Sequence, residues 1–300
     1  MTIPHPSPRQ TLTHLRGLME SRGIQPKKKL GQNFLIDLNL FGVIVRAAEM
    51  VREDLVLEVG SGTGSLTNRL AEQAGYVLSV EIDPDFFALA QEAVAGRPNV
   101  TLLCADILKN KNALNPEVLA KLGELQKRLG CSRLKLIANL PYVVATPVIA
   151  NFLLSEFSLE RLVVMVQWEI AERLLAQPGT EHYGALAVLV QSLADVEMVR
   201  PRVPPAVFWP RPQVASAIVR IRPSAAKRAH VGDVLRFRSF LRDLYTHRRK
   251  NLRSALSALP SGRRKKAEVD QKLADLGLDA TGRAEDLDIE QHLRLCAAFG

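Results

Sequence analysis

The sequence has few cysteines and no long apolar run, and both absences limit what the protein can be. The three cysteines among its 300 residues, Cys104, Cys131 and Cys296, are widely spaced and odd in number. They fit neither a disulfide framework nor a metal-binding cluster. No apolar run approaches the roughly 20 residues needed to span a bilayer, and segment 1–10 lacks the apolar core of a secretory signal. We therefore expect a cytoplasmic protein with reduced cysteines, no metal site and no membrane contact.

Negative charge is scarce in one part of the chain. The net charge is +9, but residues 222–266 contain 14 Lys and Arg against two acids, a net +12, so the remaining chain sums to −3. A solubilising surface would scatter its charges, whereas a concentrated basic segment favours a polyanionic partner held by one face. Hydrophobic residues make up 47% of the chain, enough for a core in each domain-sized segment.

Apolar runs rich in β-branched residues alternate with helical patterns through the first two thirds of the chain. Strands are expected at 55–59, 76–82, 100–105, 134–138 and 162–166, and helices at 65–73, 84–95, 116–129, 146–154 and 169–176. This alternation predicts an α/β fold with a mainly parallel sheet covered on both faces. Two later runs, 196–203 and 214–221, frame a Pro-rich loop and are expected to close the sheet as an antiparallel edge.

The pattern changes after residue 222, where Gly residues separate purely helical segments. We expect a catalytic domain over 1–222, whose first 36 residues form an extension that covers the cofactor, and a small all-helical RNA-binding domain over 223–300. Helices are expected at 9–22, 37–50, 237–245, 249–259, 264–276 and 288–299.

A Gly-rich turn, Gly60-Ser61-Gly62-Thr63-Gly64, follows the first of the alternating strands. Such a turn brings backbone N–H groups and a helix N-terminus close to a ligand. The dinucleotide fingerprint requires a sixth-position Gly, but Ser65 stands there. The Gly-x-Gly-x-Gly spacing, with Glu58 on the strand, is typical of S-adenosylmethionine methyltransferases, so a Rossmann-like methyltransferase sheet is expected.

Acidic residues follow the next two strands. Glu81 ends one strand and can accept hydrogen bonds from two ribose hydroxyls, and Asp106 follows the next and can take an adenine amino group. Each could alone be a helix cap, but together with the Gly turn they predict a nucleoside-containing cofactor at the carboxyl edge of the sheet.

The motif Asn139-Leu140-Pro141-Tyr142 follows the fourth strand and makes the resemblance specific. The chain resembles the KsgA-like family of small-subunit rRNA adenine dimethyltransferases along nearly its whole length. The opening segment 29–37, the Pro-rich loop 203–220 and the basic segment 248–253 also resemble motifs of that family.

The resemblance implies a set of site residues. Asn33, Leu35 and Gly60 would contact the methionine end of the cofactor. The full expected cofactor set is Asn33, Leu35, Gly60, Gly62, Glu81, Ile82, Asp106, Ile107 and Asn139. The expected catalytic residues are Asn139, Leu140, Pro141, Tyr142 and Phe208, and the expected RNA-binding residues are Arg248, Arg249, Lys250 and Arg253.

The residue types suit methylation of an adenine amine. The N6 lone pair is delocalised into the ring, so hydrogen bonds from N6–H to the Asn139 side chain and to a carbonyl at Leu140 or Pro141 would favour a tetrahedral nitrogen. No general base is expected, because the nitrogen becomes acidic as it is alkylated. The flipped base would stack on Tyr142, with Phe208 opposite, but Phe208 could instead be a core aromatic beneath the loop.

Some positions depart from the family pattern. Segment 143–145 is apolar where polar residues are usual, Trp168 stands where a Lys is usual, and Gln213 and Ala215 replace a usual Lys and Asp. These changes leave the expected cofactor residues intact and concern RNA contacts near the site.

The leading hypothesis is therefore a monomeric enzyme that dimethylates two adjacent adenosines near the 3′ end of small-subunit rRNA within a pre-ribosomal 30S particle. The related large-subunit rRNA methyltransferase is the runner-up, and a DNA adenine or small-molecule methyltransferase ranks lower. A non-catalytic factor of the same fold, acting in ribosome assembly or transcription, remains the alternative from another class. The intact Glu81, Asp106 and Asn139–Tyr142 motif favours catalysis.

Overall fold

The computed structural model describes residues 12–130, 133–262 and 264–300, so Cys131 and the start of the helix expected at 9–22 lie outside it. The chain divides into two compact units. The first extends to Ala171 and includes Glu197–Arg222, and the second contains Glu172–Val196 and Pro223–Gly300. The sequence placed 172–196 in the catalytic domain. The segment belongs instead to the second unit, because its helix α8 (Ala185–Gln191) packs against α10 (Val234–Tyr245) and α13 (Ile289–Phe299).

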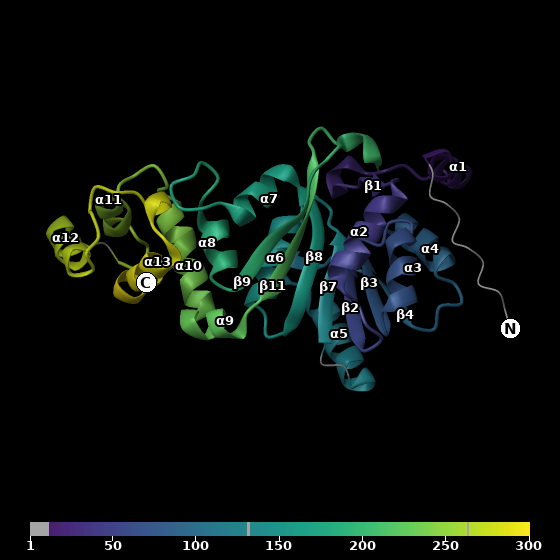
Figure 1. Cartoon of the computed structure of the whole chain (residues 1–300), viewed down its shortest axis with the longest axis horizontal. Helices are drawn as coiled ribbons and strands as arrows, with labels where there is room; N and C mark the ends of the chain where they lie inside the picture. Colours follow the sequence, from purple (N-terminus) through teal and green to yellow (C-terminus); the bar gives the residue numbers. More distant parts are fainter. Residues whose placement is uncertain (1–11, 131–132, 263) are drawn as a thin grey trace. The chain divides into compact units, whose positions relative to one another are not determined.

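A seven-stranded sheet forms the centre of the first unit (Figure 1). Its spatial order is β4 (Val100–Cys104), β3 (Tyr76–Glu81), β2 (Asp54–Val59), β7 (Arg133–Asn139), β8 (Leu159–Gln167), β11 (Ser216–Pro223) and β9 (Ala194–Val203). The first five strands pair in parallel, and β11 pairs antiparallel with β8. The expected parallel sheet with an antiparallel edge is confirmed.

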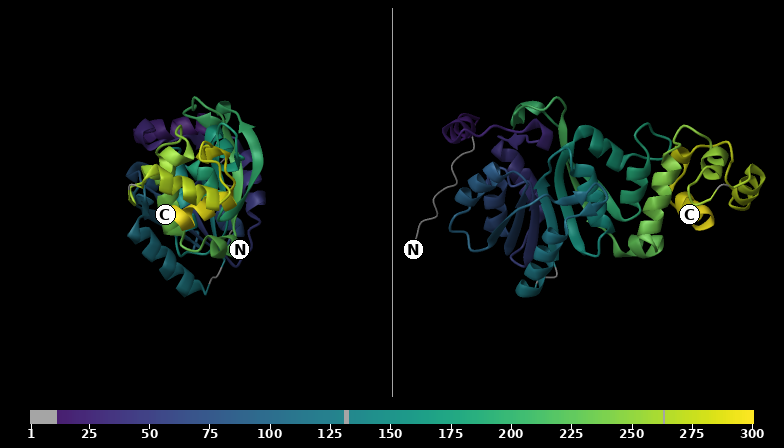
Figure 2. Two further views of the ribbon diagram at one scale, coloured as in Figure 1. Left: turned by 90° about the vertical axis from the view of Figure 1, so that its left-hand side faces the viewer. Right: turned by 180° about the vertical axis from the view of Figure 1, so that it is seen from behind.

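Helices cover both faces of this sheet, as Figures 1 and 2 show. One face carries α2 (Leu38–Ala48), α3 (Ser65–Gln73) and α4 (Pro84–Ala93), and the other carries α5 (Pro116–Leu129) and α6 (Ala145–Leu154). The sequence gives these helices clear starts: Asp37, Asp83 and Asn115 accept hydrogen bonds from the first turns of α2, α4 and α5. An apolar cluster fills the space between α2, α3 and the sheet, and its members Ile44, Leu70, Val56 and Ile137 are all 0% exposed.

The parallel strands all end at one edge of the sheet, where the loops carry the expected site residues. The N-terminal segment reaches this edge through α1 (Leu12–Arg22), a 3-10 turn (Lys28–Leu30) and the short strand β1 (Phe34–Leu35). β1 pairs antiparallel with β10 (Phe208–Trp209) of the Pro-rich loop, which follows a second 3-10 turn (Pro205–Val207). Beyond β4, the chain makes a small hairpin, β5 (Leu108–Asn110) and β6 (Ala113–Leu114).

The second unit is helical. Besides α8, α10 and α13 it contains the end of α7 (Trp168–Leu175), α9 (Ala225–Val231), α11 (Leu252–Ser257), α12 (Lys266–Asp275) and a 3-10 turn (Ala284–Asp286). The helix expected at 249–259 begins only at Leu252, because the Asn251 side chain accepts from Ser254 N–H and caps it there. Among the described residues, no helix is both long enough and apolar enough to cross a bilayer.

Candidate active site

The Gly-rich turn between β2 and α3 requires glycine at three positions. Gly60, Gly62 and Gly64 have φ values of 83°, 54° and 76°, a region that other residues rarely adopt. A Cβ on Gly60 would lie 3.2 Å from the Pro141 ring, and one on Gly62 would lie 3.1 Å from the Phe34 ring. The turn is therefore pressed between the Asn139–Tyr142 motif and β1, so the expected cofactor and catalytic motifs are in contact.

Two carboxylates near the turn have different environments. Glu58 is 0% exposed and its Oε2 accepts hydrogen bonds from Thr67 and Ser79, each over 2.6 Å. Burial raises the pKa of Glu58 to about 8, and these hydrogen bonds only partly oppose that shift. Glu58 is thus a buried residue that supports the turn and does not line the cavity.

Glu81, at the end of β3, lines the cavity itself. Its Oε2 accepts from Gly62 N–H over 2.9 Å and its Oε1 accepts from Asp83 N–H over 3.0 Å. Burial raises the pKa of Glu81 even though these hydrogen bonds favour the ionised form. The two backbone donors orient the carboxylate, and its remaining lone pairs can accept hydrogen bonds from a ligand.

A second cavity adjoins the first and shares Gly60, Glu81, Ile82 and Pro141 with it. Asp106 and Ile107 line this second cavity. Asp106 is exposed and accepts from Leu108 N–H over 2.9 Å, while the Ile82 side chain is 41% exposed, which is unusual for an isoleucine. An exposed apolar side chain beside a carboxylate suits a planar ring with polar edges.

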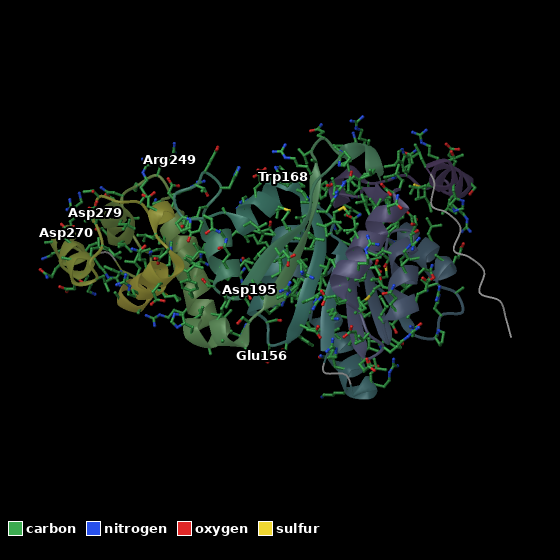
Figure 3. The ribbon with its side chains drawn as sticks, viewed as in Figure 1. Glu156, Trp168, Asp195, Arg249, Asp270 and Asp279 are labelled. Atoms are coloured by element: carbon green, nitrogen blue, oxygen red, sulfur yellow. The ribbon has the colours of Figure 1, made fainter. Side chains whose placement is uncertain are left out.

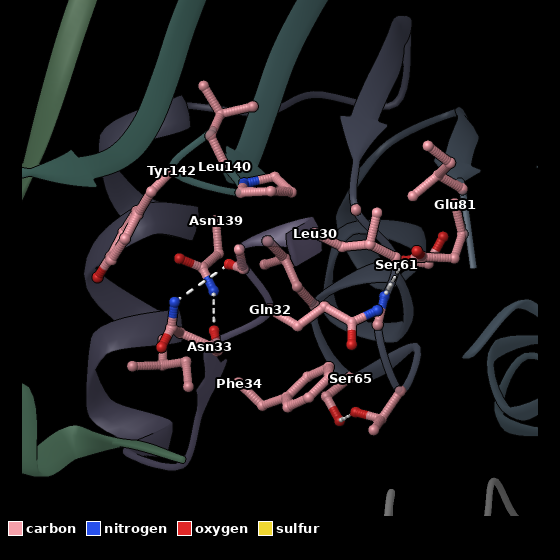
Figure 4. Close-up of a pocket in the computed structure, with 18 of the residues that line it drawn as sticks. Leu30, Gln32, Asn33, Phe34, Ser61, Ser65, Glu81, Asn139, Leu140 and Tyr142 are labelled. Carbon is pink, nitrogen blue, oxygen red and sulfur yellow. Dashed lines mark hydrogen bonds between the residues drawn. The ribbon is translucent and has the colours of Figure 1, made fainter. Parts of the chain in front are cut away.

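Asn139 ends β7, and its side chain has a defined orientation. Its Nδ2 donates to the backbone carbonyl of Asn33 over 3.1 Å (Figure 4). No hydrogen bond to Asn139 Oδ1 is formed within the described part of the chain. The amide therefore presents its acceptor oxygen to the cavity, as the proposed contact with an adenine amine requires.

The sequence left open whether the carbonyl of Leu140 or that of Pro141 is the second acceptor, and the backbone hydrogen bonds after Asn139 distinguish them. Leu140 N–H donates to Met165 O over 3.2 Å, which anchors the motif to β8. The carbonyl of Pro141 accepts from Val144 N–H over 3.0 Å, whereas the described residues place no hydrogen bond on the Leu140 carbonyl. Leu140 is therefore the better second acceptor. The Tyr142 hydroxyl is 2.6 Å from Ser216 Oγ, which holds the phenol at the edge of the cavity.

The first cavity brings together most of the residues singled out from the sequence (Figure 4). These are Asn33, Leu35, Gly60, Gly62, Glu81, Ile82, Asn139, Leu140, Pro141 and Tyr142. Sequence reasoning missed other lining residues, among them Gln32, Phe34, Ser61, Thr63 and Ser65. Each of the five is adjacent in the sequence to a residue of a recognised motif, and this adjacency is the one feature of the sequence that could have identified them.

The sequence also missed the residue that anchors the N-terminal segment to the site. Asp83 is 1% exposed and accepts from Lys27 Nζ over 2.7 Å and from Gln32 Nε2 over 2.8 Å. Burial alone would raise the pKa of Asp83, but the hydrogen bonds that it accepts, together with the charge of Lys27, outweigh burial and lower the pKa. Asp83 thereby ties the segment that carries Asn33 to the end of β3.

Phe208 differs from the expectation that it stacks on a base. It is 2% exposed, lies opposite Leu35 in the β1–β10 pair and packs in the apolar core with Phe41 and Val203. It does not line either cavity. The structure therefore shows the alternative arrangement, a core aromatic beneath the loop, because pairing of β10 with β1 turns this side chain inward.

The four expected RNA-binding residues of the second unit fall into two groups. Arg248 forms an ion pair with Glu285 over 2.7 Å and also donates to the Glu181 carbonyl, and Arg253 pairs with Asp270. Arg249 and Lys250 are exposed and have no ion pair within the part of the chain that the structure describes. Figure 3 shows Arg249 at the edge of this unit. Of the four expected RNA-binding residues, Arg249 and Lys250 are therefore the two whose charges no acid of the described chain neutralises.

The sheet order and the loops at its carboxyl edge define the class of protein, a Rossmann-like methyltransferase fold. A dimethyladenosine transferase from Plasmodium falciparum has this fold, with a TM-score of 0.69 and 23% identity, over 89% of this chain and 97% of that one. The 23S rRNA methyltransferase ErmE matches with a TM-score of 0.60 and 26% identity, over 89% of this chain and 99% of its own.

The sequence comparisons narrow the class to one family. Residues 23–298 match the profile of a family described as ribosomal RNA adenine dimethylase. Proteins named ribosomal RNA small subunit methyltransferase A are similar: that of Moorella thermoacetica is 39% identical over 274 residues, covering 91% of this chain and 92% of its own. That of Lactiplantibacillus plantarum is 40% identical over 289 residues, covering 95% and 93%. The chain belongs to the ribosomal RNA adenine dimethylase family, as the motifs had indicated.

Proposed function

We propose that this protein transfers methyl groups from S-adenosylmethionine to N6 of two adjacent adenosines near the 3′ end of small-subunit rRNA, giving N6,N6-dimethyladenosine. The proposal includes action as a monomer on a pre-ribosomal 30S particle in the cytoplasm. The observation that carries the chemistry is the Asn139 amide, whose donor is engaged by Asn33 and whose acceptor faces the cavity.

The lining of the two cavities fits the proposed cofactor. The Glu81 carboxylate can accept from ribose hydroxyls, and Ile82 with Asp106 offers an apolar face and a polar edge for an adenine. Gly60 and Gly62 leave space where a Cβ would contact Pro141 or Phe34, so the backbone can approach a ligand closely. When bound, S-adenosylmethionine supplies an electrophilic methyl group on its sulfonium.

The protein's own groups would act on the target amine. Asn139 Oδ1 and the Leu140 carbonyl accept the two N6–H hydrogen bonds, which withdraws the lone pair from ring conjugation and aims it along one direction. The Gly60–Pro141 contact fixes that direction relative to the cofactor turn. No lining side chain is needed as a base before transfer, because the proton is released once the nitrogen has become cationic.

The target base must leave its stack to reach Asn139. Tyr142, held by Ser216, offers an aromatic face at the cavity edge, and one such stack contributes about 1–3 kcal/mol. Arg249 and Lys250 provide unneutralised charge for phosphates, since phosphate contacts dominate affinity for RNA. Arg248 and Arg253 form ion pairs with Glu285 and Asp270, so they mainly stabilise the unit to which they belong.

The small-subunit target is supported by the relatives of 39–40% identity that carry that name. The decisive experiment incubates unmethylated small subunits, or large subunits as the matched control, with the protein and labelled S-adenosylmethionine. Mass spectrometry of the rRNA digests should find N6,N6-dimethyladenosine in the small subunit alone. Label in large-subunit rRNA would favour the alternative target, and label in neither particle would reject the proposed function.

A further inference from the structure

Trp168 and Arg202 form a contact at the edge of the catalytic unit that the proposed mechanism does not use. Trp168 follows β8 and begins α7, and its N–H donates to the Ala215 carbonyl over 2.9 Å. The guanidinium carbon of Arg202, near the end of β9, lies 4.9 Å from the centroid of the Trp168 ring. This distance is typical of a cation–π contact.

The backbone of Arg202 is held in an unusual conformation. Its φ is 45°, a left-handed value that few non-glycine residues adopt. The side chain is nevertheless exposed and forms no ion pair within the described ranges. By contrast, Arg220 and Arg222 on the neighbouring strand β11 are both paired with Glu197. The fold thus directs an unneutralised guanidinium onto an indole rather than onto a carboxylate.

This pair lies next to the residues that position Tyr142. Ser216, whose hydroxyl contacts Tyr142, is opposite Gln167 in the β8–β11 register, and Trp168 is the next residue. Met165, on the same strand end, accepts the hydrogen bond from Leu140 N–H. Figure 3 shows Trp168 at α7, where β8 ends. The half-buried indole is therefore at the same sheet edge as the catalytic motif and within the same compact unit.

We propose that the Trp168 indole and the Arg202 guanidinium form a stacking surface for the RNA base adjacent to the adenine that enters the cavity. When one base leaves a stack, its neighbour loses a stacking partner, and aromatic rings and guanidinium planes are the groups that replace it in RNA complexes. In a stack of indole, guanidinium and base, each planar group packs its face against a neighbouring planar group. This inference rests on the proposed function and names the contact that holds the flanking nucleotide.

A phosphate is a poorer occupant of this surface. The neighbouring residue Glu169 is exposed in the first turn of α7 and would repel an anion. The face of the indole ring also offers no hydrogen-bond donor or positive charge to a phosphate. A neutral, flat base with a π-face matches both groups.

The test measures kcat/KM for methyl transfer to reconstituted small subunits whose rRNA carries a ligated synthetic 3′ segment. That segment is either intact or abasic at the nucleotide 5′ or 3′ of the adjacent adenosines. The proteins are wild type, Trp168→Phe, Trp168→Leu, Arg202→Gln and Arg200→Gln. Arg200 lies two residues earlier on β9, is also exposed and has no cation–π contact within the described ranges, so its variant controls for loss of charge alone.

We expect Trp168→Leu to lower kcat/KM on intact RNA by about 5- to 150-fold, the factor that corresponds to one lost base stack, and Trp168→Phe to lower it by about threefold or less. Arg202→Gln should lower it more than Arg200→Gln does. On one of the two abasic RNAs, wild type and Trp168→Leu should become nearly equal, because the stacked base is gone.

The inference is overturned if Trp168→Leu has the same kcat/KM as wild type on intact RNA. It is also overturned if the loss of kcat/KM caused by Trp168→Leu is as large on both abasic RNAs as it is on intact RNA. Equal melting temperatures of wild type and Trp168→Leu exclude unfolding as the cause of a loss. If wild type methylates neither intact nor abasic particles, the proposed function fails and the inference fails with it. If wild type transfers methyl groups and Trp168→Leu has the same kcat/KM, the inference is rejected but the proposed function stands.

Discussion

The side-chain amide of Asn139 donates a hydrogen bond to the backbone carbonyl of Asn33, over 3.1 Å and across 106 residues of chain. This contact selects one of the two possible orientations of the amide, the one with its oxygen in the cavity. Asn33 is in turn placed by the segment that Lys27 and Gln32 tie to Asp83. The catalytic acceptor is thus oriented by the N-terminal segment and not by its own strand.

Replacement of Asn139 should separate catalysis from RNA binding. Asn139→Ala removes the acceptor, and we expect kcat to fall by about 10²–10³, the cost of losing one preorganised group of this kind. Asn139→Asp keeps an oxygen but places a second one against the Asn33 carbonyl, so it should lose a similar factor. Filter binding should give an unchanged Kd for rRNA in both variants. Normal methylation of rRNA by Asn139→Ala would show that the catalytic assignment is wrong.

Phe208 should act through the core. Phe208→Ala leaves a cavity between β1, β10 and α2, and we expect the free energy of unfolding to fall by about 3–5 kcal/mol in urea titrations. Phe208→Leu largely fills that space, so it should lose less stability and retain methyl transfer. A Phe208→Leu protein that is folded but inactive would instead return the ring to the base-stacking role that the sequence suggested.

The cations of the second unit should differ in their effect on RNA affinity. The double variant Arg249→Gln, Lys250→Gln removes two free charges, and the slope of log Kd against log salt should decrease by about 1–2. The matched double variant Arg248→Gln, Arg253→Gln removes the same charge but breaks ion pairs with Glu285 and Asp270. It should lower the melting temperature and leave the salt slope nearly unchanged. Equal slopes for the two variants would contradict this division.

The parts of the fold that the sequence predicts are those with local signals. Helices 65–73 and 116–129 have the predicted bounds because Gly64 precedes the first, while Asn115 and Gly130 cap the ends of the second. Helix α8 was missed because its seven residues, Ala185–Gln191, are too few to show a period. Its packing on α10 and α13, which moves 172–196 into the second unit, depends on tertiary contacts that no local pattern contains.

The site divides in the same way. Gly60, Glu81 and Asn139 were predictable because Gly60 follows a strand, Glu81 and Asn139 end one, and parallel strands end at one edge of a sheet. The inward direction of Phe208 depends on the pairing of β10 with β1, in which Phe208 lies opposite Leu35 although the two residues are 173 positions apart in the chain.

 Pairing over such a separation leaves no local pattern, and the same is true of the bonds from Lys27 and Gln32 to Asp83.

Glu58 should make stability depend on pH. Its folded pKa of about 8 lies above the value of 4.5 expected for the unfolded chain, because burial disfavours the carboxylate. A raised pKa contributes stability that is complete below pH 4.5 and is lost as the pH rises through about 8. Glu58→Gln cannot ionise, so between these pH values the free energy of unfolding should shift in favour of the variant, by up to about 1.4 kcal/mol per pH unit. Urea titrations of both proteins from pH 5 to about 9 measure this difference. A constant difference over that range would mean that folding does not raise the pKa of Glu58.

Gly60 should be sensitive to a methyl group for a reason other than its backbone angle. Gly60 and Gly96 have nearly the same φ, 83° and 82°, so an alanine at either position has a similar strain, about 1–2 kcal/mol. A Cβ at Gly60 lies 3.2 Å from the Pro141 ring, whereas a Cβ at Gly96 has nothing within 4 Å. Both variants should therefore lose similar stability, but only Gly60→Ala should displace the turn from the Asn139–Tyr142 motif. We expect kcat/KM of Gly60→Ala to fall on the order of 10- to 100-fold, since small misplacements of reacting groups cost this much. Gly96→Ala, assayed at a temperature where both variants are folded, should transfer methyl groups like wild type. Equal activity of the two variants would show that the contact between Gly60 and Pro141 does not align the cofactor turn with the catalytic motif.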